Sequence, residues 1–184
     1  MKILPHTVLI VLFICNASTA QACGKERWLV KVGKDKDAAK VTTEIKQTNV
    51  AELIAFGAPI NPNIRRDSRY APAETTLYQI SGRLVVIKRE ADQDYHLVIQ
   101  DNKGRTMIVE SPAGSCAKGS RFEKEISQVH RQLNAKYHIR SKKKKPNDLV
   151  TVTGIGFFDK IHGQEGVAPN GIELHPILAI TFNK

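Results

Sequence analysis

The sequence lacks the motifs that usually identify an enzyme. It contains no HExxH metal motif, no CxxC pair, no GxSxG nucleophile motif and no GxxxxGK phosphate loop. It also has no apolar run near the length of about 20 residues that a membrane-spanning helix needs. We therefore expect a protein without a membrane-spanning helix. No single motif in the sequence identifies a reaction.

The first 22 residues have the features of a secretory signal peptide. Lys2 supplies the positive start, and Val8–Ile14 is a short apolar core. Either Ser18-Thr19-Ala20 or Ala20-Gln21-Ala22 stands at the expected cleavage position. Removal of this segment leaves about 160 residues, enough for one domain with its own core. We expect an exported protein, located in a periplasm or secreted.

Cysteine is scarce, and its count agrees with export. The chain has three cysteines, and removal of the signal peptide takes away Cys15 and leaves Cys23 and Cys116. In an oxidising compartment two remaining cysteines favour a single disulfide. The alternative is that Cys23 becomes a lipidated first residue, although Ala20–Ala22 lacks the large aliphatic residue expected in a lipoprotein signal.

The charge balance is strongly basic. The whole chain carries a net charge of +10, and Lys2 is the only charged residue of the signal, so the mature chain carries +9. Such a surface favours anionic partners: nucleic acid, anionic headgroups or acidic glycans.

Residues 23–73 are interpreted as a small α/β extension that packs on the C-terminal part of the chain. The segment Glu26–Lys31 has the aromatic and β-branched composition of a strand, and Thr48 with Glu52 resembles the start of a short helix. The segment 58–72 contains three prolines and three arginines and is interpreted as a linker.

Residues 74–184 show a more regular pattern. Apolar alternation and turn residues predict five strands and one helix, the helix lying between the third strand and the fourth. The strands are expected at Leu77–Glu90, Asp94–Gln100, Arg105–Glu110, Leu149–Phe158 and Ile172–Phe182, and the helix at Arg121–Ala135. This order, with glycines in the first and fourth strands, is that of an OB-fold barrel. The prediction is therefore a mainly β protein with one or two helices; a different five-stranded α+β sheet is the alternative.

Four segments carry a resemblance to known sequences: ERWLVKVG, GRLVVIKREADQDYHLVI, TMIVESP and HGQEGVAPNGIELHP. Together they resemble a group of exported bacterial proteins of unknown activity, and the last segment is the most specific. The resemblance implies an OB-fold-like C-terminal domain and transfers no catalytic residue.

In an OB-fold the loops between strands 1–2 and 4–5 lie at the same end of the barrel. Here they are Glu90–Asp94 and Asp159–Gly171, and both contain acidic residues. Because residues i and i+2 share a face of a strand, Asp94 lies with His96 and Glu173 with His175. Carboxylate and imidazole groups together suit zinc or another divalent metal. The candidate metal ligands are Glu110, Asp159, His162, Glu173 and His175.

The alternative for this region is purely structural. His175 precedes Pro176 among apolar residues, which is typical of a buried, hydrogen-bonded histidine. Glu173 would then pair with a lysine or accept hydrogen bonds from loop amides.

A second group of residues suits an anionic polymer. The candidate contacts are Lys88, Arg89, Tyr95, Lys142, Lys143, Lys144 and Lys145. Lysine runs are also common as solvated loops, and Tyr95 has core packing as its alternative role.

The leading hypothesis from the sequence is an exported OB-fold-like binding module for an anionic polymer such as nucleic acid or an acidic glycan. The alternatives are a metal-dependent hydrolase, such as a nuclease, and a structural module that binds another envelope protein.

Overall fold

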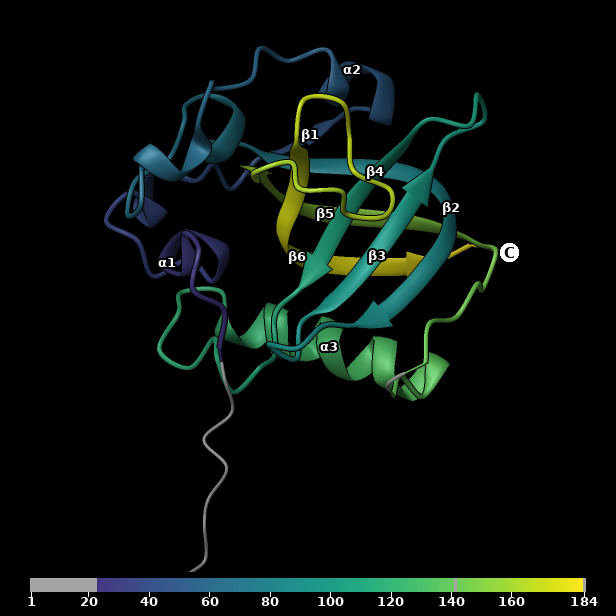
Figure 1. The fold of residues 1–184 in the computed structure, drawn as a ribbon. Coiled ribbons are helices and arrows are strands. Elements are labelled where there is room, and N and C mark those ends of the chain that lie inside the picture. Colours follow the sequence, from purple (N-terminus) through teal and green to yellow (C-terminus); the bar gives the residue numbers. More distant parts are fainter. Residues whose placement is uncertain (1–22, 141, 184) are drawn as a thin grey trace, which may run out of the picture.

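The computed structural model describes residues 23–140 and 142–183 (Figure 1). The predicted signal peptide and Cys15 lie outside the described residues.

The centre of the structure is a closed five-stranded barrel. Its strands are β2 (Leu77–Arg89), β3 (Tyr95–Gln100), β4 (Thr106–Ser111), β5 (Asp148–Phe158) and β6 (Ile172–Phe182). They follow the order β2-β3-β4-β6-β5, and β2 also pairs with β5 to close the barrel. Helix α3 (Glu123–Tyr137) lies between β4 and β5 in the chain and covers one end of the barrel (Figure 1). The predicted OB-fold-like barrel is confirmed.

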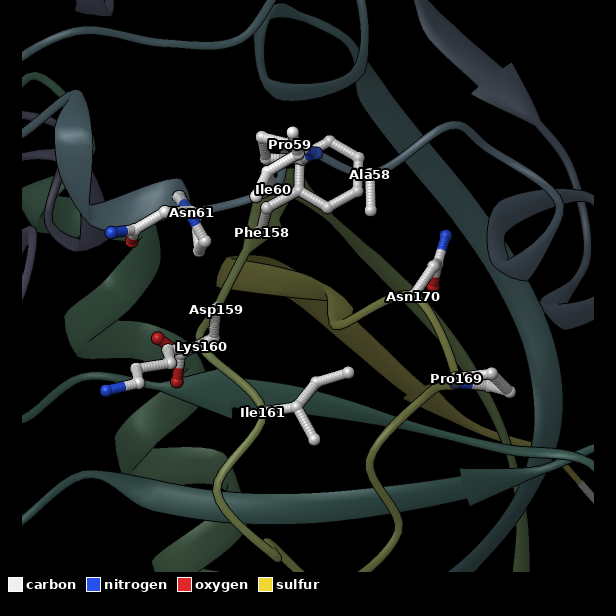
Figure 2. Close-up of a pocket in the computed structure, with 11 residues that line it drawn as sticks. Ala58, Pro59, Ile60, Asn61, Phe158, Asp159, Lys160, Ile161, Pro169 and Asn170 are labelled. Carbon is white, nitrogen blue, oxygen red and sulfur yellow. The ribbon is translucent and has the colours of Figure 1, made fainter.

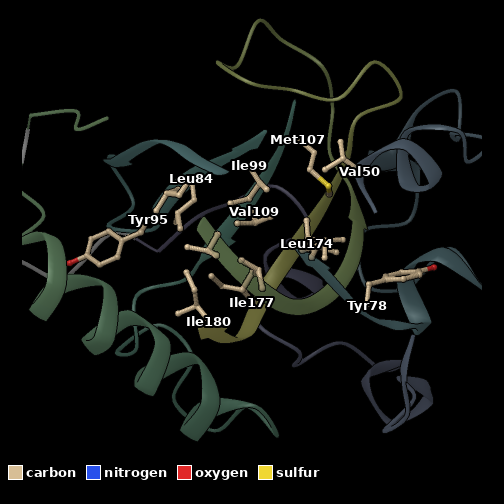
Figure 3. Close-up of a cluster of buried hydrophobic side chains, with 14 of the residues drawn as sticks. Val50, Tyr78, Leu84, Tyr95, Ile99, Met107, Val109, Leu174, Ile177 and Ile180 are labelled. Carbon is tan, nitrogen blue, oxygen red and sulfur yellow. The ribbon is translucent and has the colours of Figure 1, made fainter. Parts of the chain in front are cut away.

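Strand alternation explains which side chains fill the barrel. On β3 and β4, Leu97, Ile99, Met107 and Val109 are fully buried and point into one hydrophobic cluster, where Leu174 of β6 joins them (Figure 3). Their removal from water is the main driving force for closing the barrel.

Two neighbouring aromatic residues at the end of β5 face opposite ways. Phe158 belongs to the main hydrophobic cluster, and Phe157 contacts the imidazole ring of His175 with ring centroids 5.5 Å apart. The sequence allows only one of the two to point inward, because neighbouring strand residues alternate.

Residues 23–76 wrap one side of the barrel. They form α1 (Trp28–Lys31), β1 (Ile45–Gln47), α2 (Val50–Ile54) and three single turns of 3₁₀ helix at Ala38–Lys40, Pro62–Ile64 and Ala73–Thr75. Strand β1 pairs in parallel with the start of β2, so the extension adds a sixth strand to the barrel sheet.

The predicted strand at Glu26–Lys31 is wrong. This segment forms the one-turn helix α1, in which Val30 is buried and Arg27 reaches across to Glu74. These tertiary contacts override the weak local preference of a short apolar run. The predicted start of α2 is also displaced by one residue, because the side chain of Asn49, and not that of Thr48, accepts the Glu52 N–H.

Cys23 and Cys116 form a disulfide that joins the start of the extension to the loop between β4 and α3. The predicted pairing is confirmed. It excludes a lipid thioether on Cys23 in this state, because the sulfur atom is already bonded. Among the described residues, no helix is long and apolar enough to cross a membrane.

We expect the disulfide to contribute strongly to stability, since it closes a loop of 93 residues. Replacing both cysteines by serine should lower the free energy of unfolding by about 2–5 kcal/mol, chiefly by increasing the entropy of the unfolded chain. Urea unfolding of the oxidised protein and of the double variant measures the difference. Equal midpoints and slopes would contradict the expectation.

Gly156 on β5 provides a second test of the packing. A Cβ atom at this position would collide with the backbone oxygen of Ala73 and lie 2.9 Å from the ring of Tyr78. Gly156→Ala should therefore destabilise the protein by about 1–3 kcal/mol. Gly57→Ala is the matched control, because a Cβ atom at Gly57 meets nothing within 4 Å. Similar unfolding midpoints for the two variants would contradict the described approach of β5 to the extension.

Candidate functional site

The outer face of β3, β4 and β6 carries polar side chains that are nevertheless buried. Because Leu97, Val109 and Leu174 point into the barrel, their neighbours His96, Glu110 and Glu173 point outward. His96 and Glu173 are only 2% and 1% exposed. Other segments of the chain must therefore cover this face.

The covering segments are α1 and the loop 159–171. From α1, the Lys31 ammonium lies 5.3 Å from the ring centroid of Phe157 and 3.9 Å from Asp159 Oδ2. From the loop, the backbone oxygen of Glu165 lies 2.9 Å from His96 Nε2. A Cβ atom at Gly166 would collide with Val98 of β3, which shows how closely the loop lies on the strand.

Three side chains beneath this cover form the Asp94–Glu110–His175 group. Each side chain offers one ligand atom, and the three ligand atoms lie within 4.8 Å of one another. This group is the only cluster of that kind among the described residues. His175 Nδ1 lies 3.2 Å from Glu110 Oε2, and His175 Nε2 lies 3.8 Å from Asp94 Oδ2. Asp94 immediately precedes β3, Glu110 is in β4 and His175 in β6, so barrel closure brings them together.

Several atoms of this group have no hydrogen-bond partner. They are Asp94 Oδ2 and both ring nitrogens of His175, and the neighbouring Glu173 Oε2 shares this property. The 3.2 Å approach of Glu110 to His175 lacks the alignment of a hydrogen bond. Asp94 Oδ1, in contrast, accepts a hydrogen bond from the Ala113 N–H at 3.0 Å. Buried polar atoms without partners are rare in folded proteins, because losing their hydration carries a free-energy cost.

His96 joins the group to the loop. Its Nε2 must donate to the Glu165 backbone oxygen, because a carbonyl oxygen only accepts. Its Nδ1 lies 3.0 Å from Glu110 Oε1. A proton is therefore needed on both ring nitrogens, or else on the Glu110 carboxyl group. In both cases Glu110 Oε1 is hydrogen-bonded to His96, and Glu110 Oε2 faces His175.

Carboxylates outnumber cations around this face. Burial alone would lower the pKa of Lys31, but the carboxylates of Asp159, Glu110, Glu173 and Asp94 together raise it. One lysine thus interacts with four carboxylates.

The burial of this face and its many carboxyl groups also shift the pKa values of the other titratable groups. Burial, followed by the nearby Asp92 carboxylate, raises the pKa of Asp94 to about 8. Burial and the carboxylate of Glu110 also raise the pKa of Glu173 well above its usual range. The pKa of His175 is well below its usual range, because burial and then the positive charge of Lys31 disfavour the imidazolium. Burial therefore works against an ion pair between His175 and the two carboxylates.

A neighbouring buried network has fully paired charges. Arg27 donates two hydrogen bonds to Glu74, at 2.6 and 2.7 Å, and others to the backbone oxygens of Phe158, Ser68 and Arg65. Glu74 additionally accepts from the N–H groups of Tyr70 and Phe158.

Arg69 of the same network forms a buried ion pair with Asp35 at 2.7 Å. The unpartnered atoms at Asp94 and His175 differ in this respect from the two ion pairs.

The structure brings together only part of the metal set expected from the sequence. Glu110 and His175 are in the Asp94–Glu110–His175 group, while Asp159, His162 and Glu173 are not. Asp159 faces Lys31, and His162 is exposed on the loop, where its backbone N–H donates to Gln164 Oε1. The third member, Asp94, shares a strand face with His96, and this alternation is the sequence signal that could have identified it.

The predicted polymer contacts occupy different environments. Lys88 pairs with Glu90 at 2.8 Å, and Lys143 with Glu165 at 2.9 Å. Tyr95 is 4% exposed and its ring stacks on His130 at a centroid distance of 3.8 Å, so it offers no open face for stacking.

The remaining predicted cations are exposed, namely Arg89, Lys142, Lys144 and Lys145. None of these has a carboxylate within ion-pairing distance among residues 23–140 and 142–183.

A surface pocket of about 440 Å³ lies between the linker and the loop 159–171 (Figure 2). Ile60 and Ile161 are exposed at its rim, and Asn170 is held by its side-chain amide, which donates to the backbone oxygens of Leu53 and Phe56. The pocket does not include Asp94, Glu110 or His175.

No protein-family model and no curated protein matches this sequence. A solved structure described as an OBody bound to hen egg-white lysozyme is similar at a TM-score of 0.40 and 14% identity. The match covers 67% of this chain and 87% of that chain.

The Arg27–Glu74 pair should be required to hold α1 over the site. Arg27→Ala leaves Glu74 buried without its partner, so the free energy of unfolding should fall by about 3–5 kcal/mol. Lys40→Ala is the control, since Lys40 pairs with Asp37 at the surface and its side chain is 70% exposed. Chemical denaturation should show no measurable change for Lys40→Ala. Equal effects of the two substitutions would contradict the proposed role of Arg27.

Proposed function

We propose that this protein is an exported OB-fold-like module that binds an anionic polymer, such as a nucleic acid or an acidic glycan, through a basic edge beside the second half of β2. The basic edge is defined as Lys88, Arg89 and Lys142–Lys145.

The observation that carries the proposal is the attachment of the lysine run to the barrel. Lys144 and Ile87 exchange two backbone hydrogen bonds, of 3.0 and 2.8 Å, as an isolated antiparallel bridge. The N–H of Asn147 donates to the oxygen of Leu84, which continues the pairing along β2. A run that sequence alone treats as a solvated loop is thus held next to Lys88 and Arg89. Ordering these charges in advance reduces the entropy lost on binding.

The usual ligand face of an OB-fold supports the choice of this edge. That face lies on the second and third barrel strands, between the loops that correspond here to 90–94 and 159–171. In this protein the loop 159–171 lies on His96 and Val98 of β3. The same face carries Glu110, whose carboxylate repels phosphate. Contact through the basic edge is therefore electrostatic and independent of base sequence.

Export is part of the proposal. It is supported by the signal-like residues 1–22 and by the Cys23–Cys116 disulfide, which suits an oxidising compartment.

The proposal predicts strongly salt-dependent binding. A fluorescein-labelled 20-nucleotide oligo(dT) is the probe, and its affinity is measured by fluorescence anisotropy between 25 and 250 mM salt. Replacing Lys142, Lys144 and Lys145 by glutamine should weaken binding and reduce the slope of log K against log salt by about 2, since each lost phosphate contact removes about 0.7.

A variant with the same net charge is the control. Lys25, Lys36 and Lys46 are exposed in the extension, away from the basic edge, and their replacement by glutamine removes the same three charges. This variant should keep most of the affinity and slope. Equal losses in both variants, or binding that does not respond to salt, would refute the proposal. Repeating the titration with heparin distinguishes a glycan from a nucleic acid as the preferred polymer.

A further inference from the structure

We propose that Asp94, Glu110 and His175 bind one divalent transition-metal ion, of the zinc class, between the barrel and the covering helix α1. This inference is independent of the proposed polymer binding, since none of the three residues belongs to the basic edge.

The first support is geometric. A metal ion of this class binds nitrogen and oxygen ligands at about 2.0–2.2 Å, so its ligands lie a few ångströms apart. The three side chains already present one ligand atom each within 4.8 Å of the others. Asp94 immediately precedes β3, Glu110 is in β4 and His175 is in β6, so the pairing of these neighbouring strands holds the three side chains together.

The second support is independent of the acidic character of the cluster. His175 is 0% exposed, and both of its ring nitrogens lack a hydrogen-bond partner. Asp94 Oδ2 is likewise buried and unpartnered, and it faces the same imidazole. An ion bound between them would take a lone pair of Asp94 Oδ2 and the single lone pair of the His175 imidazole, while the other ring nitrogen would carry the proton and face the remaining carboxylate.

The third support is the local charge. Glu110 and Asp94 lie 3.2 and 3.8 Å from His175 and have no lysine or arginine within ion-pairing distance among the described residues, while the nearby Arg27–Glu74 and Arg69–Asp35 pairs are balanced. A divalent cation would supply the missing positive charge when these carboxyl groups ionise.

The ligand set selects the kind of ion. A neutral imidazole with two carboxylates suits Zn²⁺, and next Mn²⁺ or Co²⁺, whereas Mg²⁺ and Ca²⁺ prefer oxygen ligands alone. The second shell is also present, because His96 hydrogen bonds to Glu110 Oε1 and the Ala113 N–H to Asp94 Oδ1. Since His175 is fully buried and Glu110 only 13% exposed on its side chain, the ion would join β3, β4 and β6 rather than meet a large substrate.

The test uses tag-free, oxidised protein, because a polyhistidine tag binds zinc and the disulfide keeps the two thiols from competing. The protein is dialysed against EDTA, freed of chelator and titrated with Zn²⁺, Mn²⁺, Mg²⁺ and Ca²⁺ by calorimetry. One equivalent of Zn²⁺ should bind, more tightly than Mn²⁺, with Mg²⁺ and Ca²⁺ much weaker. Thermal unfolding should shift upward with Zn²⁺ concentration, since the ion binds only the folded state.

Three variants locate the site. Asp94→Asn and Glu110→Gln keep the shape of the side chains and should each weaken Zn²⁺ binding about 100-fold or more, since even second-shell changes cost 10- to 100-fold. His175→Ala should abolish binding and the visible absorption of the Co²⁺-substituted protein. If His175→Ala does not fold, the two conservative variants still decide the question.

His162→Ala is the matched control, because His162 is an exposed histidine on the covering loop. It should bind Zn²⁺ as the unmodified protein does. The proposal is overturned if Zn²⁺ does not bind at one equivalent. It is also overturned if Asp94→Asn and Glu110→Gln leave binding unchanged, or if His162→Ala removes it. Stronger binding of Ca²⁺ or Mg²⁺ than of Zn²⁺ overturns the assignment as well.

Discussion

The buried ion pair between Arg27 and Glu74 is the interaction on which the arrangement of this protein depends. One guanidinium donates to both carboxylate oxygens and to three backbone oxygens, from the linker and from the end of β5. A buried charge pair of this kind is tolerated only when the hydrogen-bonding capacity of both partners is used. These hydrogen bonds attach the start of α1 to the end of β5 and to Glu74. They hold α1 where Lys31 reaches Asp159 and the ring of Phe157, beside the buried Glu173 and His175.

Covering this face changes what the barrel can do. An OB-fold usually receives its ligand on the face that this chain closes with α1 and the loop 159–171. The polar side chains left beneath the cover cannot be solvated, so they must find partners within the protein or bind an ion. The cations of the basic edge lie elsewhere, along the second half of β2, next to the Ile87–Lys144 bridge. The polymer and metal proposals therefore concern two separate surfaces of the same barrel.

Most of the barrel was predictable because its strands are apolar, β-branched runs bounded by turn residues. The predicted strand Asp94–Gln100 differs from β3 by one residue at its start, and the predicted Ile172–Phe182 coincides with β6. The helix at Glu123–Tyr137 was also predictable from apolar residues at helical spacing. The prediction failed at Glu26–Lys31, where the run is short and its conformation is set by contacts with Glu74, far away in the sequence.

The candidate site was predictable in part. The sequence by itself determined that Asp94 and His96 share one strand face and Glu173 and His175 another, because the side-chain period of a strand is two. It also favoured the Cys23–Cys116 pairing, because two cysteines remain once the predicted signal peptide is removed. Only the tertiary structure decided that Asp94, Glu110 and His175 meet and that His162 does not. The reason is physical: barrel closure sets which strands are neighbours, and the cover by α1 sets which outward side chains lose water. Neither property is encoded in the periodicity of a single strand.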